Sequence, residues 1–373
     1  MSLLNESQEM LGQAVGRYLS DNYDFESRTK ALSQGLWPEA LWQGFAEELG
    51  ILGLPFPETH NGLGLGALDT MVVMQALGRN LAAEPFLSSV VGVGALTVAL
   101  PADEAAALQP LVDAVISGTA RVGLAISDAL GDPGPGNRQL SSDRLTGSIP
   151  IVAAASSATH FIVSAATPDG ETALVLVERS AAGCESRPVP TIDGNTALAL
   201  EFDVARSDAT VVAVSADAAI EWAHDALHAA LAAEIVGIVD ALIEITVEFA
   251  KQRVQFSKPI AQFQAIQHRL ADMYVEGELA RSMAMLAAIK MDAPRTERRA
   301  AIAAAVARAG MAGRKVGEGA IQIHGGIGTT DELIVGHYFK RLLAIEALFG
   351  RTYGHVERYA RYRTDLGQPI PVV

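Results

Sequence analysis

Cysteine is nearly absent from this sequence. The 373 residues contain one cysteine, Cys184, which excludes both a disulfide framework and a thiolate metal site. We expect Cys184 to be a lone thiol in a strand or loop of the middle third. No cluster of His, Asp and Glu has the spacing of metal ligands either. The lack of disulfides fits a reducing compartment, and we predict a cytoplasmic protein.

Positive charge is also scarce. The 28 Lys and Arg residues are outnumbered by 43 Asp and Glu residues, which gives a formal net charge of -15 and a pI near 5.0. The basic residues are scattered along the chain, so no basic stripe is available for a phosphate backbone. The sequence therefore predicts no nucleic-acid partner.

Long apolar runs are missing as well. A membrane-spanning helix needs roughly 18 apolar residues, and even the stretch AALAAEIVGIVDALIEITV contains Glu234, Asp240 and Glu244. The N-terminus carries acids early and has no basic segment followed by an apolar run, so we expect no signal peptide. Half of the residues are apolar, and we predict a soluble, packed protein with no membrane partner.

The texture of the sequence changes twice, which predicts three domains. Residues 1–116 contain apolar residues at spacings of three and four, as in MLGQAVGRYL and MVVMQALGRNLA, which indicate helices. Residues 117–216 contain short β-branched runs such as THFIVSAA and TALVLVE, which indicate an antiparallel β domain. Over residues 217–373 four long helices joined by short loops indicate a four-helix bundle, so the fold class is α+β.

Two glycine-rich stretches are candidate phosphate loops. HNGLGLGALD, with Gly62 to Gly66, lies between helices and does not follow a strand, so we interpret it as a tight connection. QIHGGIG, residues 322–328, also lies between helices. A helix C-terminus with left-handed backbone explains one of its glycines but not all three. Adjacent glycines also expose backbone N–H groups to a ligand, with the amide of Gln322 beside them.

The segment RVQFSKPIAQFQAIQHRLADM, residues 253–273, gives this loop a context. The two segments together resemble the motifs R-x-x-F-G-x-P-I-x-x-F-Q-x-x-Q and Q-x-x-G-G-x-G of the flavoprotein acyl-CoA dehydrogenase family. The order α, β, α and the N-terminal stretch LGLPFPETHNGLGLGALD match the same family, so the resemblance covers nearly the whole chain. The stretch HGGIGTTDELIVGHYFKRL is most similar to small subunits of pimeloyl-CoA dehydrogenase-type heteromeric enzymes.

The resemblance implies an FAD site shared by two subunits. In this family one chain holds the isoalloxazine with its β domain, and the bundle of the other chain clamps the adenosine pyrophosphate. Carried over, Arg253 would pair with a pyrophosphate oxygen and Phe256 would pack at the adenosine side. Gln322, Gly325 and Gly326 would approach the ADP part. Arginine gives a forked, permanently charged phosphate contact, and glycine allows close backbone approach, so the assignment is physically sensible.

Several positions depart from the family pattern. Ser257 stands where R-x-x-F-G has its glycine. The flavin-contacting T-E-P-x-A-G-S-D becomes SDALGDPG, which keeps the hydroxyl of Ser127 and the acid that follows it. The Trp and Thr of K-x-W-I-T-N fall on Ile151 and Ala153. Two further adenosine contacts fall on the bulky pair Arg351 and Tyr353.

The catalytic base of the family is missing at both of its usual positions. The reaction removes an α-proton from an acyl-CoA while the β-hydrogen leaves as hydride to the flavin, and this requires a carboxylate base. The two alignments place the glutamate on Phe349 and on Leu227, which is followed by His228 where an arginine is frequent. The nearest carboxylate, Glu346, precedes Phe349 by one turn, and we interpret it as a solvated or paired side chain.

This asymmetry predicts the small subunit of a heterotetrameric acyl-CoA dehydrogenase. Its partners would be an acyl-CoA substrate, a homologous large subunit that holds the flavin ring and the base, and an electron-transferring flavoprotein. Three alternatives stay open. They are a self-sufficient homo-oligomer with Glu346 as a displaced base, a non-catalytic scaffold of the same fold, and an oxidase or monooxygenase that uses His324, His337 or His355.

Overall fold

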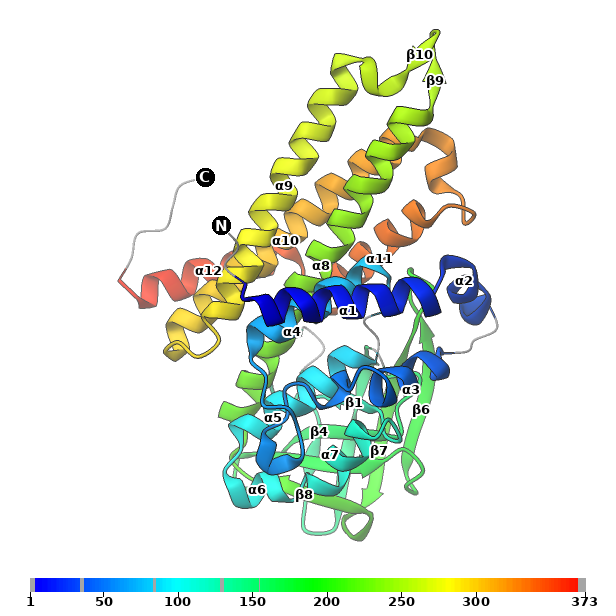
Figure 1. Ribbon diagram of the computed structural model, residues 1–373. Coiled ribbons are helices and arrows are strands. Elements are labelled where there is room, and N and C mark those ends of the chain that lie inside the picture. Colours follow the sequence, from blue (N-terminus) through cyan, green and yellow to red (C-terminus); the bar gives the residue numbers. More distant parts are fainter. Residues whose placement is uncertain (1–3, 34–36, 83–84, 128–130, 154, 368–373) are drawn as a thin grey trace. The chain divides into compact units, whose positions relative to one another are not determined.

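The computed structural model describes residues 4–33, 37–82, 85–127, 131–153 and 155–367. The chain folds as two units (Figure 1). The first unit consists of residues 1–25, 71–83 and 228–373, and the second consists of residues 26–70 and 84–227. In the described part of the chain, no helix combines the length and the apolar composition needed to cross a membrane.

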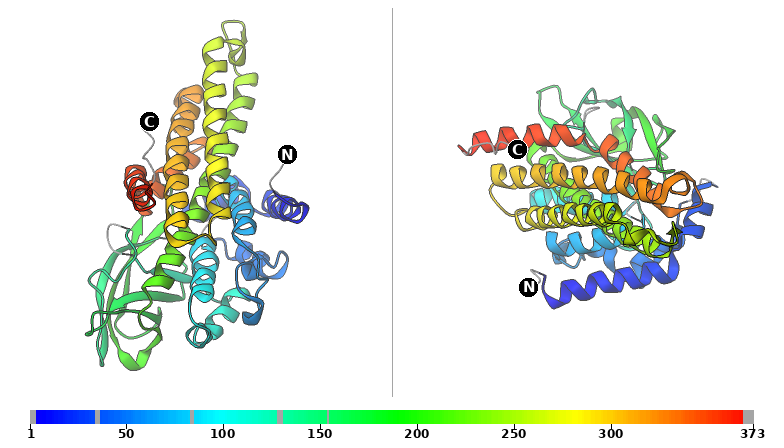
Figure 2. Two further views of the ribbon diagram at one scale, coloured as in Figure 1. Left: turned by 90° about the vertical axis from the view of Figure 1, so that its left-hand side faces the viewer. Right: turned by 90° about the horizontal axis from the view of Figure 1, so that it is seen from above.

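The first unit is built from long helices. They are α1 (Glu6–Asn22), the end of α4 (Ala67–Arg79), α8 (Asp217–Gln252) from His228 onward, α9 (Gln264–Ile289), α10 (Arg295–His324), α11 (Ile334–Leu348) and α12 (Thr352–Asp365). Figures 1 and 2 show α8, α9 and α10 side by side along their lengths. Helix α10 also packs against α11 and α12. The four predicted bundle helices are confirmed, and α12 is an additional helix.

Close helix packing in this unit depends on two glycines. A Cβ on Gly78 of α4 would overlap the carbonyl of Glu234 in α8, and a Cβ on Gly237 would overlap the carbonyl of Gln75. The absence of side chains at these positions therefore allows the backbones of α4 and α8 to touch. The carboxylate of Glu234 is fully buried there and accepts a hydrogen bond from Nε of Arg341 at 2.7 Å.

Short helices form the α-helical part of the second unit. They are α2 (Phe25–Ser33), α3 (Glu39–Glu47), η1 (Ile51–Gly53), η2 (Glu58–His60), the π-helical turn η3 (Leu87–Gly92), α5 (Val93–Ala99), α6 (Ala102–Ala106) and α7 (Gln109–Ile116). The stretch HNGLGLGALD connects η2 to α4. A Cβ on Gly62 would overlap the Phe56 carbonyl, and Gly64 has a φ of 63°. Backbone geometry thus accounts for these glycines without a ligand.

A sheet forms the rest of the second unit. Its strands are β1 (Val122–Ala125), β2 (Gln139–Leu140), β3 (Arg144–Val152), β4 (His160–Ala166), β5 (Thr172–Glu178), β6 (Cys184–Pro190), β7 (Thr196–Ala205) and β8 (Ala209–Ala213), the last preceded by the turn η4 (Arg206–Asp208). The strand order is β6-β7-β3-β2-β4-β5-β8, and β1 also pairs with β4. Buried side chains such as Leu145, Phe161 and Leu200 form its core.

The sheet is mixed, although antiparallel pairs dominate as expected. Strands β1 and β2 run parallel to β4, which the long connections between them and β4 permit. Strand β6 contains Pro188 and Pro190, and it lies at the edge of the sheet, where a missing N–H is tolerated. Cys184 begins β6, and burial, opposed by the charge of Arg179, raises the pKa of its thiol to about 11. This thiol therefore stays protonated at neutral pH.

Candidate functional site

Arg253 lies directly after the end of α8. Its backbone N–H donates to the carbonyl of Phe249 at 2.8 Å, so the last helical turn fixes its position. Its side chain is exposed and has no hydrogen bond or ion pair within the part of the chain that the structure describes. The guanidinium is thus available to an external anion.

The residues after Arg253 form a two-residue hairpin between β9 (Val254–Gln255) and β10 (Lys258–Pro259), which the turn η5 (Ile260–Gln262) joins to α9. Both turn residues have positive φ, 51° at Phe256 and 66° at Ser257, as a type I′ turn requires. Ser257 therefore adopts the conformation that the family's glycine would adopt without strain. The turn presents Phe256, 88% exposed, with its ring edge-to-face on Phe263 at 6.1 Å.

The three glycines of QIHGGIG have different reasons to be glycine. Gly325 ends α10 with φ 64° and ψ -146°, a conformation that is essentially restricted to glycine. A Cβ on Gly328 would lie 2.9 Å from Cβ of His324. Gly326 has neither constraint, since its φ is not positive and a Cβ there would meet nothing within 4 Å. The fold thus leaves the choice of glycine at position 326 unexplained. Gly326 is exposed, and its carbonyl accepts from the hydroxyl of Thr329 at 2.9 Å.

The structure brings the two motifs together through a pair of rings. The imidazole of His324, directly before Gly325, stacks on the ring of Phe249 with centroids 4.2 Å apart and planes at 28°. Phe249 lies one helical turn before Arg253, so the glycine loop η6 (Gly325–Thr329) is joined to the end of α8. Gln322, one position before Ile323 on α10, is exposed beside this loop.

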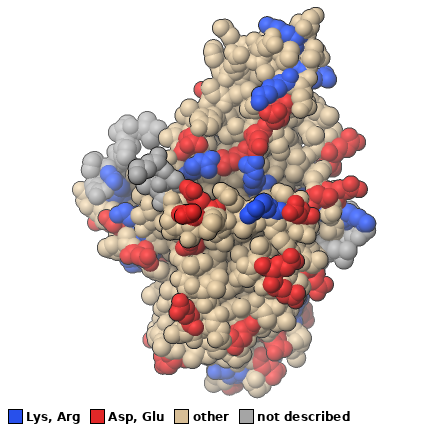
Figure 3. Space-filling view, in the orientation of Figure 1, with Lys and Arg blue, Asp and Glu red and all other residues tan. Residues whose placement is uncertain are grey.

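Positive charge is present at the hairpin end of the first unit. Figure 3 shows Lys and Arg side chains around the position of β9 and β10. Lys251 pairs with Glu248, and the ammonium of Lys258 lies over the ring of Phe263 at 4.4 Å. The chain as a whole carries a net charge of -15. Cations that include Arg253 nevertheless lie together at this end, and they are suited to bind a phosphate group.

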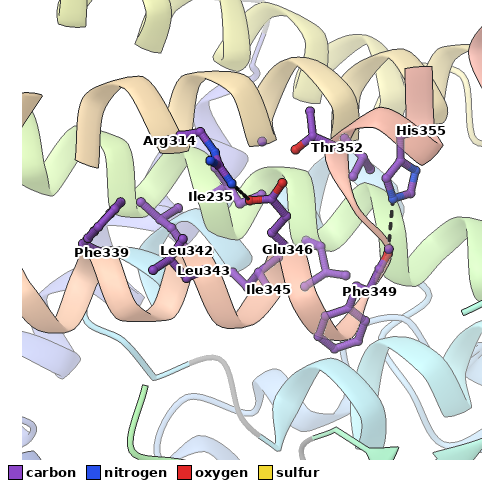
Figure 4. A pocket seen from close by; sticks show the side chains of 14 residues that line it. Ile235, Arg314, Phe339, Leu342, Leu343, Ile345, Glu346, Phe349, Thr352 and His355 are labelled. Atoms are coloured by element: carbon purple, nitrogen blue, oxygen red, sulfur yellow. Dashed lines mark hydrogen bonds and ion pairs between the residues drawn. The ribbon is translucent and has the colours of Figure 1, made fainter. Parts of the chain in front are cut away.

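The first expected base position, Phe349, lies at the end of α11. Its carbonyl accepts a hydrogen bond from Nε2 of His228 at 3.0 Å. It also accepts one from Nε2 of His355 at 3.2 Å (Figure 4). Burial, together with the positive fields of His228 and Arg358, lowers the pKa of His355 to about 3. Two buried imidazoles therefore hold the backbone here, and residue 349 provides no carboxylate.

The remaining carboxylate candidate, Glu346, is paired. Its Oε2 accepts from Nη2 of Arg314 at 2.8 Å at the edge of a pocket between α8, α10, α11 and the start of α12 (Figure 4). The pocket is lined mainly by apolar side chains such as Phe339 and Leu342, and an adjoining groove includes Arg351 and Tyr353. Glu346 is thus held in an ion pair with Arg314 at the edge of this pocket.

The other expected positions lie in the second unit. Leu227, the second base position, is half-buried, and its Cδ2 would lie 3.4 Å from a Cβ on Gly92. The carbonyl of Ser127 accepts from the buried guanidinium of Arg138 at 3.0 Å, while the acid that follows Ser127 falls outside the described residues. Ile151 lies near the end of β3, and Ala153 directly follows the strand. Aliphatic side chains thus occupy the positions of the family's Trp and Thr.

The three histidines considered for oxidase chemistry each bind a backbone carbonyl. His324 donates to Ala320 at 2.9 Å, His337 to Asp331 at 3.1 Å, and His355 to Phe349. Within the described ranges, no group of three or more His, Cys, Asp or Glu side chains could hold a metal ion. These histidines are therefore used in the fold.

Comparison with known proteins decides the family. Residues 5–110 match the N-terminal domain of acyl-CoA dehydrogenases and residues 218–367 match the C-terminal domain. The acyl-CoA dehydrogenase IpdE2 of Mycobacterium tuberculosis is 30% identical over 338 residues, 90% of this chain and 91% of that protein. The chain belongs to the acyl-CoA dehydrogenase family. Its activity is that of an acyl-CoA dehydrogenase, and the family's cofactor is FAD.

Two further relatives also match most of the length of this chain. The acyl-CoA dehydrogenase FadE27 of M. tuberculosis is 29% identical over 86% of this chain and 87% of its own length. In the crystal structure of the ChsE4-ChsE5 complex from M. tuberculosis, one chain superposes with a TM-score of 0.87, 26% identity and full coverage of both chains. The acyl-CoA dehydrogenase fold predicted from the sequence is confirmed.

The residues of this chain fit one part of FAD better than the other. An available guanidinium at Arg253, the exposed amide of Gln322 and the exposed, side-chain-free backbone at Gly326 suit a pyrophosphate and its nucleoside. The positions that would contact the isoalloxazine offer Ile151, Ala153 and no base. The Phe249–His324 stack and the two histidines on the Phe349 carbonyl give no signal in the sequence, because both depend on contacts between distant residues.

Proposed function

We propose that this chain is the small subunit of a heteromeric acyl-CoA dehydrogenase and completes an FAD site of a homologous large subunit. The main support for this proposal is that Phe349 stands where the family's glutamate would lie. Its carbonyl is held by two buried histidines, and the neighbouring carboxylate of Glu346 is paired with Arg314. The similarity to a chain of the ChsE4-ChsE5 complex, which contains two named components, supports a heteromeric assembly.

In this proposal the bundle binds and orients the cofactor. Arg253 donates a charged hydrogen bond to the pyrophosphate. The exposed backbone of Gly326 approaches the ADP part, next to Gly325, whose own N–H is donated to the carbonyl of Ile321. Gln322 offers its amide at the edge of the same surface, and Phe256 packs at the adenosine side. FAD, when bound, supplies the hydride acceptor for the β-hydrogen of the acyl-CoA.

Proton removal then belongs to the partner. Neither Phe349 nor Leu227 can accept the α-proton of an acyl-CoA, so we assign the carboxylate base and the flavin-ring pocket to the large subunit. Ser127 is retained as a hydroxyl in this chain's own sheet, without the aromatic and hydroxyl contacts that the family places beside it. The partner that accepts electrons from the complex would be an electron-transferring flavoprotein.

The test is the flavin content of the complex. We expect this chain co-purified with its large subunit to contain roughly two FAD per four chains, as one site for each pair of unlike subunits requires. An Arg253→Met substitution should lower this content, whereas Arg17→Met, an exposed arginine on α1, should not. This chain purified alone with stoichiometric FAD and full turnover would contradict the proposal, and a complex without flavin would support a scaffold.

A further inference from the structure

His324 is held in place by contacts with its own helix and with the glycine loop that follows it. Its side chain is buried, and Nδ1 donates to the carbonyl of Ala320 one turn earlier on α10 at 2.9 Å. The glycine loop packs against His324 at Gly328, where the absence of a side chain leaves room for Cβ of His324. The orientation of this ring therefore fixes the path of the backbone through Gly325 and Gly326.

The stack on Phe249 carries that orientation to a second element. Phe249 is half-buried on α8, and its carbonyl accepts the N–H of Arg253. A rotation or shift of the His324 ring would change the distance between the glycine loop and the end of α8. The two groups that the proposed function assigns to one ligand, Arg253 and Gly326, are thus set relative to each other through these rings.

The chemistry of the pair suits a positioning role. Stacked rings at 4.2 Å contribute beyond their buried area and restrain rotation. Burial, opposed by the hydrogen bond to Ala320, lowers the pKa of His324, so the ring is uncharged at neutral pH and adds no charge beside the loop. Its Nδ1–H is already donated to Ala320.

We propose that Phe249 and His324 are a positioning pair that holds Arg253 and the Gly325–Gly326 backbone at the separation needed to clamp the pyrophosphate and adenosine of FAD. The inference rests on the proposed function. It assigns a role to two side chains that do not themselves reach the cofactor.

Substitutions at the two positions separate the ring stack from the hydrogen bond. His324→Asn keeps an amide N–H for the Ala320 carbonyl and removes the ring, whereas His324→Phe keeps a ring and removes the N–H. The Kd for FAD is measured by flavin fluorescence on the complex with its large subunit. We expect Phe249→Ala and His324→Asn each to raise this Kd about threefold to tenfold. His324→Phe should restore a Kd close to that of the wild type.

A control distinguishes positioning from loss of stability. Met273 is buried on α9, and its sulfur would lie 2.9 Å from a Cβ on Gly319 of α10, so Met273→Ala weakens the bundle without touching the stack. It should lower the melting temperature and leave the Kd for FAD unchanged. A wild-type Kd in Phe249→Ala and His324→Asn, or a loss in His324→Phe equal to that in His324→Asn, would overturn the positioning pair while the proposed function stands. A wild-type complex that binds no FAD would instead overturn the proposed function.

Discussion

At the scale of single residues, the clearest feature is a set of polar side chains whose partners are distant in sequence. Glu234, which interrupts an apolar stretch of α8, is fully buried and paired with Arg341. The sequence shows a charge on an apolar helix but not its partner 107 residues away. The absence of a base at Phe349 is a prediction from the sequence motif alone. The histidines that hold its carbonyl depend on tertiary contacts and could not be predicted.

Glu346 is the residue on which a displaced-base mechanism would depend. Its carboxylate is engaged by Arg314, and ion pairs of this exposure contribute little to stability. We therefore expect Glu346→Gln to leave kcat/KM of the complex within about twofold of the wild type and the fold intact. Steady-state kinetics with an acyl-CoA substrate would measure this. A loss of turnover with normal flavin content would show that Glu346 is the base.

His355 should make stability depend on pH. Burial lowers its pKa from 6.5 to about 3, so the unfolded chain takes up a proton at a higher pH than the folded chain. The stabilising contribution of the neutral ring is thus complete above pH 6.5 and is lost as the pH falls towards about 3. Between these values the slope should approach about 1.4 kcal/mol per pH unit.

The measurement is the free energy of unfolding by denaturant at several pH values. The His355→Asn variant should be less stable at pH 7 and should lack this part of the slope, since asparagine does not titrate. His268→Asn, at an exposed position on α9, is the control for removing a histidine. An unchanged slope in His355→Asn would show that other groups account for the pH dependence.

At the scale of elements, periodicity predicted the long helices well because each has a continuous buried face. Helix α12 was missed because His355 is its one buried residue among those described, and its other positions are largely charged or tyrosine. Strand β6 was missed because it contains two prolines and is largely exposed. Edge position makes both features acceptable, and edge position is a property of the assembled sheet.

The contact between α4 and α8 leaves no room for a Cβ at its glycines. Gly237→Ala would place a Cβ against the Gln75 carbonyl, which cannot move without shifting α4. We expect a loss of more than about 2 kcal/mol in the free energy of unfolding. Gly16→Ala is the matched control, because a Cβ at this position on α1 meets nothing within 4 Å. It should gain up to about 1 kcal/mol from helix propensity, and equal effects of both variants would refute the close-packing argument.

At the scale of the whole molecule, the family and the fold could be predicted from motif order, and the retention of one half of a cofactor site stays a prediction. The surface that meets other chains could not, because exposure is known only after folding. Helix α9 carries an uncharged stripe of Val275, Leu279, Ser282, Leu286 and Ile289, which share one face at spacings of three and four. Its four apolar members are between 37% and 55% exposed. Monomers rarely leave such a row in water.

The proposed heterotetramer gives this stripe an occupant, the bundle of a homologous subunit, whose helices would bury it as they bury their own apolar faces. Leu279→Arg places a charge at the centre of the stripe without disturbing the core of the first unit, since Leu279 is 47% exposed. We expect this variant to keep its helical content and to elute as a smaller species than the wild-type complex in size-exclusion chromatography with light scattering. Met10→Arg, at an isolated exposed position on α1, should assemble normally. Normal assembly of Leu279→Arg would exclude α9 as the contact surface.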